Sequence, residues 1–185
     1  MSFLLRKLLP LAIVVSIALL PASISAQSDA RDILKDHSST LQAGDLTITF
    51  IYLHPDSLGN EVAKTVLRTD EYARYQQEKS SLPKNWNLLA MRVVPYRDAR
   101  FDPTRITLTQ REITHTIGFM SVIDVVGLFN STLSRGDHAF GFLKIPERIE
   151  FKRAVEIRYD QYRTEFLLPL KWRRKYFQFL DSPGR

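Results

Sequence analysis

The C-terminal part of the chain places basic side chains among aromatic ones. Between positions 170 and 180, four basic and four aromatic residues alternate irregularly: Lys171, Trp172, Arg173, Arg174, Lys175, Tyr176, Phe177 and Phe179. Lysine and arginine attract anionic groups, while aromatic rings enter a membrane interface or stack on a ligand. The residues from Lys171 to Tyr176 therefore predict a binding site for an anionic lipid surface or an anionic glycan. The alternative is a closing strand or short helix whose apolar residues pack on the core, with the basic residues solvated.

Histidines beside carboxylates are the other residues that could do chemistry. His54 precedes Asp56 by two positions, and Asp137 directly precedes His138. An imidazole next to a carboxylate suits general acid–base work or metal binding. Neither cluster has the spacing of a zinc site or a calcium loop. We therefore expect His54 and His138 to be ordinary turn residues, and keep a secreted hydrolase or metal-dependent enzyme as an alternative.

Other catalytic signatures are missing from the sequence. The chain has no cysteine, and its serines form no Gly-x-Ser-x-Gly motif, so thiol chemistry is excluded and a serine hydrolase is not indicated. The seven glycines stand singly, without a phosphate-binding loop, so no cofactor is predicted. His115 alternates with Ile113 and Ile117 on one face of an expected strand, which is typical of a core residue.

The first 26 residues resemble an export signal in their order of residue types. Arg6 and Lys7 precede an apolar run over 8–20, and small residues follow from Ala22 to Ala26. This order predicts a secretory signal peptide over 1–26, cleaved after Ala26, with Ala22 and Ser25 as alternative cleavage sites, and a secreted or periplasmic product. The alternative is a retained anchor, but the apolar run approaches the roughly 20 residues of a membrane span only if Pro21 and two serines are counted. Without cysteine, neither a lipoprotein anchor nor a disulfide is available.

The remaining chain predicts a single domain built mainly of strands. Strands are expected over 45–53, 88–96, 105–110, 112–118, 119–126, 138–145, 155–159 and 162–168, and one helix over 69–80. Turns or loops are expected over 54–60, 98–103 and 130–137, while 61–68 fits a strand or a helix. Polar residues 27–44 predict a flexible or short helical N-terminal arm. Residues 45–185 are then expected to form one antiparallel β-sandwich of immunoglobulin-like architecture with one inserted helix.

Charge and composition complete the functional expectation. The excess of 26 lysines and arginines over 20 acidic residues is modest, so no nucleic-acid partner is expected. We expect an exported, soluble, non-catalytic binding domain or cell-envelope-associated domain, with an anionic membrane surface, a glycan or another envelope protein as partner. A structural subunit that pairs through a strand edge is a further alternative. Asn130, Ser131 and Thr132 fit the pattern of an N-glycosylation acceptor.

Overall fold

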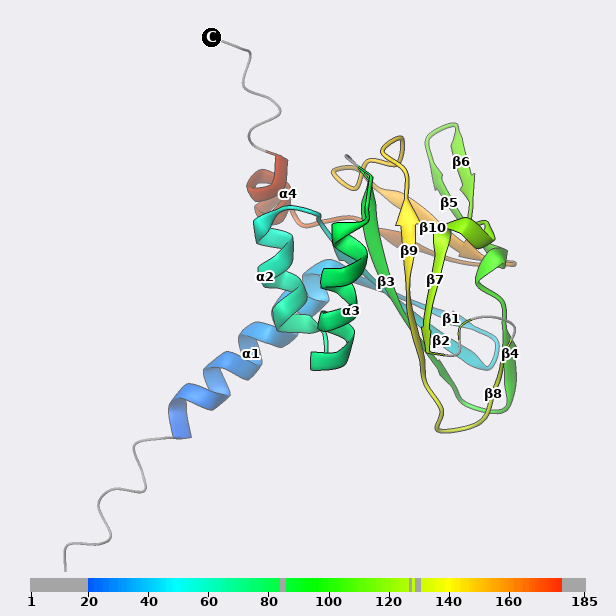
Figure 1. Ribbon diagram of the computed structural model, residues 1–185, viewed down its shortest axis with the longest axis horizontal. Helices are drawn as coiled ribbons and strands as arrows, with labels where there is room; N and C mark the ends of the chain where they lie inside the picture. Colours follow the sequence, from blue (N-terminus) through cyan, green and yellow to red (C-terminus); the bar gives the residue numbers. More distant parts are fainter. Residues whose placement is uncertain (1–19, 84–85, 127, 129–130, 178–185) are drawn as a thin grey trace, which may run out of the picture.

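The computed structural model describes residues 20–83, 86–126, 128 and 131–177 (Figure 1). Within these ranges the protein is mainly β, with antiparallel sheets and four α-helices. The helices are α1 (Leu20–His37), α2 (Ser57–Val66), α3 (Thr69–Ser80) and α4 (Leu170–Phe177). The strands are β1 (Ser38–Ala43), β2 (Leu46–Leu53), β3 (Asn87–Pro95), β4 (Ala99–Phe101), β5 (Ile106–Gln110), β6 (Ile113–Thr116), β7 (Val122–Val126), β8 (Ser131–Leu133), β9 (Ala139–Ile145), β10 (Val155–Tyr159) and β11 (Tyr162–Phe166).

The strands form two larger sheets and a small one. The five-stranded sheet has the order β1-β2-β3-β9-β7, the four-stranded sheet has the order β11-β10-β5-β6, and β4 pairs with β8. The larger sheets approach each other at β1 and β11, where the Ser39 hydroxyl lies 2.8 Å from that of Thr164 and 3.1 Å from the carbonyl of Glu165. One continuous apolar core draws residues from both sheets.

The helices cover one side of the strand assembly. Figure 1 shows all four helices gathered beside the sheets, with α2 and α3 next to each other. Helices α1 and α2 contact β2. All four residues at the end of this strand, Phe50–Leu53, are buried, so both of its faces are covered there. The end of β2 is thereby held rigidly inside the molecule.

Most of the strongly patterned elements are confirmed. Strands expected over 45–53, 88–96, 105–110, 138–145 and 155–159 correspond to β2, β3, β5, β9 and β10, and the helix over 69–80 is α3. Strands β10 and β11 form a tight hairpin, in which Tyr159 pairs with Tyr162 across Asp160 and Gln161. Asp160 adopts a φ of +54°, the left-handed conformation that a two-residue turn requires.

The expectation of one inserted helix is wrong, since the described chain has four helices. Helix α2 begins inside the segment 54–60 that was expected to be a turn. Its start is stabilised because the Asp56 carboxylate accepts a hydrogen bond from the Gly59 amide at 2.7 Å. Val62, Ala63 and Val66 then share a buried face at helical spacing. The expected loops over 98–103 and 130–137 contain the short strands β4 and β8.

The N-terminal segment 27–44 is regular in structure. Residues 27–37 belong to α1, and residues 38–43 form β1 rather than an arm, pairing with β2 from Ser38–Ile51 to Ala43–Leu46. Helix α1 crosses the predicted cleavage junction after Ala26, while residues 1–19 lie outside the described residues. None of the described helices combines the length and apolar character that a membrane span requires.

Candidate functional site

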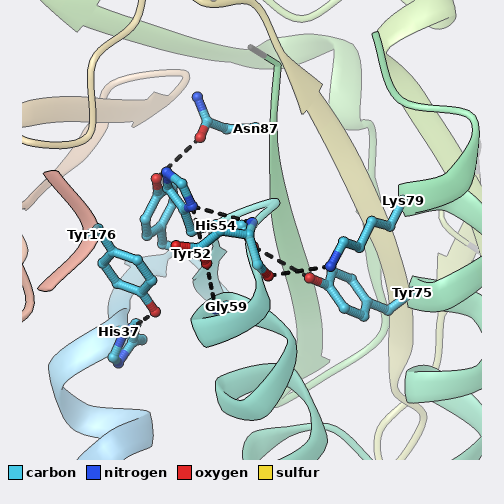
Figure 2. Close-up of polar contacts among 9 residues, drawn as sticks. His37, Tyr52, His54, Gly59, Tyr75, Lys79, Asn87 and Tyr176 are labelled. Atoms are coloured by element: carbon cyan, nitrogen blue, oxygen red, sulfur yellow. Dashed lines mark hydrogen bonds and ion pairs between the residues drawn. The ribbon is translucent and has the colours of Figure 1, made fainter. Parts of the chain in front are cut away.

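The turn after β2 brings His54 and Asp56 to a fixed position. Figure 2 shows Tyr75 and Lys79 of α3 on one side of this turn. The Tyr75 hydroxyl donates to the His54 carbonyl at 3.3 Å. Lys79 donates to the carbonyl of Asp56 at 3.2 Å. Gly59, in the first turn of α2, lies directly against the His54 backbone. Strand, helix and turn therefore position this part of the chain together.

A cleft of about 490 Å³ opens at this turn. Its walls come from the end of β2, from the segment 146–153 between β9 and β10, and from the C-terminal part of α4. In the floor, Tyr52 stacks on Phe151 with ring centroids 4.4 Å apart. The Tyr52 hydroxyl donates to the side-chain oxygen of Asn87 at 3.0 Å (Figure 2). The floor is therefore aromatic and held by both packing and a hydrogen bond.

His54 lies between aromatic rings and a carboxylate. Its ring stacks on Tyr176, with centroids 4.9 Å apart, and meets Phe177 edge-on at 5.5 Å. Its Nδ1 atom lies 3.2 Å from Oδ1 of Asp56. Burial raises the pKa of the Asp56 carboxyl, but hydrogen bonds from His54 and from the Gly59 amide outweigh it and lower the pKa overall. Asp56 is therefore a carboxylate at neutral pH.

Tyr176 connects the cleft to the end of α1. His37 Nδ1 lies 2.9 Å from the carbonyl of Ile33, and its Nε2 lies 3.0 Å from the Tyr176 hydroxyl. Because a carbonyl only accepts, Nδ1 carries the proton and Nε2 accepts from Tyr176. Burial is the largest cause that lowers the pKa of His37, and burial raises the pKa of Tyr176. Both groups are therefore neutral in the folded protein at neutral pH.

Mild acid should destabilise the fold through His37. Its folded pKa lies below the unfolded value of about 6.5, so the unfolded chain binds more protons as the pH falls through that range. The free energy of unfolding should therefore be constant above about pH 7 and decrease toward the folded pKa, as measured by urea denaturation at a series of pH values. His37→Gln should make this decrease shallower, and the decrease that remains includes the contribution of His115, whose pKa burial also lowers. An equal slope in wild type and His37→Gln would contradict the assignment.

The predicted basic–aromatic site is a helix, and its aromatic residues face inward. Trp172 and Tyr176 are 8% and 6% exposed. Trp172 Nε1 donates to Oδ2 of Asp36 at 2.9 Å, and Lys171 Nζ lies 2.5 Å from the same oxygen. The Lys175 ammonium lies 4.6 Å from the centroid of the Trp172 ring. The Trp172 and Tyr176 rings therefore pack on the core, which agrees with the alternative expectation of a short closing helix.

The basic residues of this segment take different positions. Lys171, Arg174 and Lys175 are exposed, at positions that share one face of α4, whereas Arg173 is half-buried. Their binding of an anionic surface stays a prediction. Residues 178–180 and the glycosylation pattern at Asn130 lie outside the described residues.

The other histidines do not join His54. His115 is buried, as expected for a core residue, with Nδ1 2.9 Å from Arg148 Nη2. His138 is exposed and lies 3.1 Å from an Arg68 nitrogen. In the part of the chain that the structure describes, no group of three histidine, aspartate or glutamate residues could hold a metal ion.

Two side chains, Gln110 and His115, hold the segment 146–153 in place by hydrogen bonds. The sequence analysis did not identify this segment as part of a site. The Gln110 side chain donates to the carbonyls of Glu150 and Ala154, at 2.8 and 3.1 Å, and accepts from the Glu150 amide at 2.9 Å. Arg148 is tied to His115 on β6. The sequence does show a polar residue, Gln110, at a position of the expected strand where an apolar residue would face the core. Its hydrogen-bond partners lie 40 and more residues away along the chain, so the local sequence could not identify them.

Comparison with known proteins adds no relative. No protein-family model, curated protein or solved structure is significantly similar to this chain. The class of protein must therefore be argued from the cleft and from the sequence.

Proposed function

We propose that this chain is an exported binding protein of the cell envelope and that its cleft holds a small ligand. The observation that carries the proposal is the cleft itself: about 490 Å³, with an aromatic floor and a polar rim. Small-molecule sites in proteins have this size and this combination of apolar walls with a few polar groups. Since Tyr52 and Phe151 are fixed by stacking, little ordering is needed when a ligand enters.

The rim offers hydrogen-bonding groups to such a ligand. Within the described ranges, neither the Nε2 atom of His54 nor the Glu147 carboxylate has a hydrogen-bond partner, and both residues line the cleft. Lys152 lines it as well and contributes a donor, although it also lies 3.8 Å from Glu150. Both donors and acceptors are therefore available around an apolar floor.

Export and architecture belong to the same proposal. The leader pattern over 1–26 supports export, and the described contacts of α1 with the core begin at Ile33, after the predicted cleavage junction. Removal of the leader would thus keep Asp36 and His37, which hold α4. We also propose that the two larger sheets form a β-sandwich, which is supported by their common apolar core.

Replacing His54 by alanine should weaken ligand binding at least fivefold. The substitution removes a stacking partner and a hydrogen-bonding atom from the cleft, a loss of about 1 kcal/mol or more. The measurement is saturation-transfer NMR with a panel of one-ring aromatic compounds of different charge. The matched control is His138→Ala, which removes an exposed histidine outside the cleft. The proposal fails if no compound binds, or if both variants bind as wild type does.

The His54–Asp56 contact supports a second candidate function, a secreted hydrolase. Nδ1 of His54 lies 3.2 Å from the Asp56 carboxylate and 3.3 Å from the Asp56 amide. In the tautomer whose proton is on Nδ1, the carboxylate orients the ring and leaves Nε2 to take a proton from water. Hydrolysis of p-nitrophenyl acetate by the purified protein, lost in His54→Ala, would favour this function over binding alone.

A further inference from the structure

We propose that the cleft selects an organic cation, an amine or quaternary ammonium group attached to a hydrocarbon or aromatic body. The proposal rests on the proposed binding function and specifies the chemical class of its ligand. Charge, aromatic lining and access each support it.

The cleft is acidic although the chain as a whole is basic. Among the described residues, three carboxylates line it, from Asp56, Glu147 and Glu150, against the single ammonium of Lys152, in a chain of net charge +6. Glu150 already pairs with Lys152 at 3.8 Å and with Arg153 at 3.3 Å. The charge left for a ligand therefore comes from Glu147 and Asp56.

These two carboxylates can reach a ligand. Glu147 is exposed, and the Asp56 side chain is 37% exposed at the edge of the cleft. Lys79, the nearest ammonium of α3, donates to the main-chain carbonyl of Asp56. At physiological ionic strength the Debye length is about 8 Å, so these local charges act on a bound ligand more strongly than the distant basic residues do.

The aromatic lining favours the same ligand class. Ring faces carry partial negative charge and attract a cation placed over them, more strongly where water is excluded. The half-buried Phe177 ring lines the cleft beside His54. Tyr52 and Tyr176, 0% and 6% exposed, lie beneath and are already stacked on Phe151 and His54. An apolar body can contact these rings while an ammonium group meets the carboxylates. A neutral ligand gains only the first contact, and an anion is repelled.

Three probes of similar shape separate the effect of charge from that of the ring. Phenethylamine, 2-phenylethanol and 3-phenylpropionate share a phenyl ring on a two-carbon chain and are cationic, neutral and anionic. Titrations followed by ¹⁵N-resolved NMR should perturb the amides of residues 52–56 and 147–152, with the amine binding most tightly and losing affinity as salt increases. Glu147→Gln should weaken amine binding about fivefold to tenfold and leave binding of the alcohol unchanged.

The matched control is Glu165→Gln, which neutralises an exposed carboxylate on β11 outside the cleft and should bind the amine as wild type does. If the alcohol or the carboxylate binds at the cleft as tightly as the amine, the cation proposal is overturned while the binding function stands. The cation proposal also fails if both glutamine variants lose equal affinity. If none of the three probes perturbs the cleft amides, the binding function fails with it.

Discussion

Replacing Arg92 by methionine should lower the free energy of unfolding by about 3 kcal/mol. Arg92, on β3, holds the Glu71 carboxylate of α3 through Nη2 at 2.5 Å and Nε at 3.1 Å. Nη2 also donates to the carbonyl of Val66 at 3.0 Å, so Arg92 connects β3 to the last residue of α2. Glu71 is only 4% exposed, so removal of the guanidinium leaves a buried carboxylate without its countercharge. Urea denaturation at pH 7 measures the loss.

Two further variants show whether burial is the cause. Arg158→Gln breaks an exposed pair with Glu156 of similar length, 2.5 Å, and should cost less than about 1 kcal/mol, since solvent screens that pair. The double variant Arg92→Met, Glu71→Met should recover much of the loss, because no buried charge is then left unpaired. A loss in Arg92→Met no larger than in Arg158→Gln would contradict this explanation.

Local sequence patterns predicted the strands better than the helices. Alternating apolar residues in β5 and β10 reflect one buried face, which is a property of each strand alone. The sequence leaves 61–68 open as a strand or a helix, and the structure places most of it in α2. The start of α2 was not predicted because Gly59 and Asn60 are typical of turns, whereas here Asp56 caps a helix. Strand β1 was missed because it is a polar edge strand in which only Leu41 and Ala43 are buried.

The cleft was less predictable than the fold because its walls are distant in sequence. The sequence identifies His54 and Asp56 as a pair that could act in acid–base chemistry or bind a metal. Nothing in their local sequence indicates that Tyr176 and Glu147 lie beside them. Trp172 was expected at a surface and instead packs on His37, since positions 172 and 176 share the inner face of α4. Which face of a short amphipathic helix is buried depends on its partner.

Replacing Gly59 by alanine should destabilise the protein by about 3 kcal/mol and weaken ligand binding in the cleft. A Cβ at this position would lie 1.9 Å from the His54 carbonyl oxygen and 2.7 Å from its carbon. Both are backbone atoms, so no side-chain rotation relieves the overlap, and α2 must move away from the turn. Alanine favours a helix over glycine by about 1 kcal/mol, which is too small to compensate.

This displacement should affect the site because the same turn holds its polar groups. The Gly59 amide donates to the Asp56 carboxylate that caps α2, and the His54 carbonyl that would be pushed away accepts from Tyr75. We expect urea denaturation to show the lower stability and the cleft amides to shift in the ¹⁵N NMR spectrum. Gly118→Ala is the matched control, because a Cβ there has no neighbour within 4 Å and the residue's φ of −97° suits alanine. If Gly59→Ala is as stable as Gly118→Ala and binds ligand as wild type does, close packing of α2 on this turn is not what fixes the cleft.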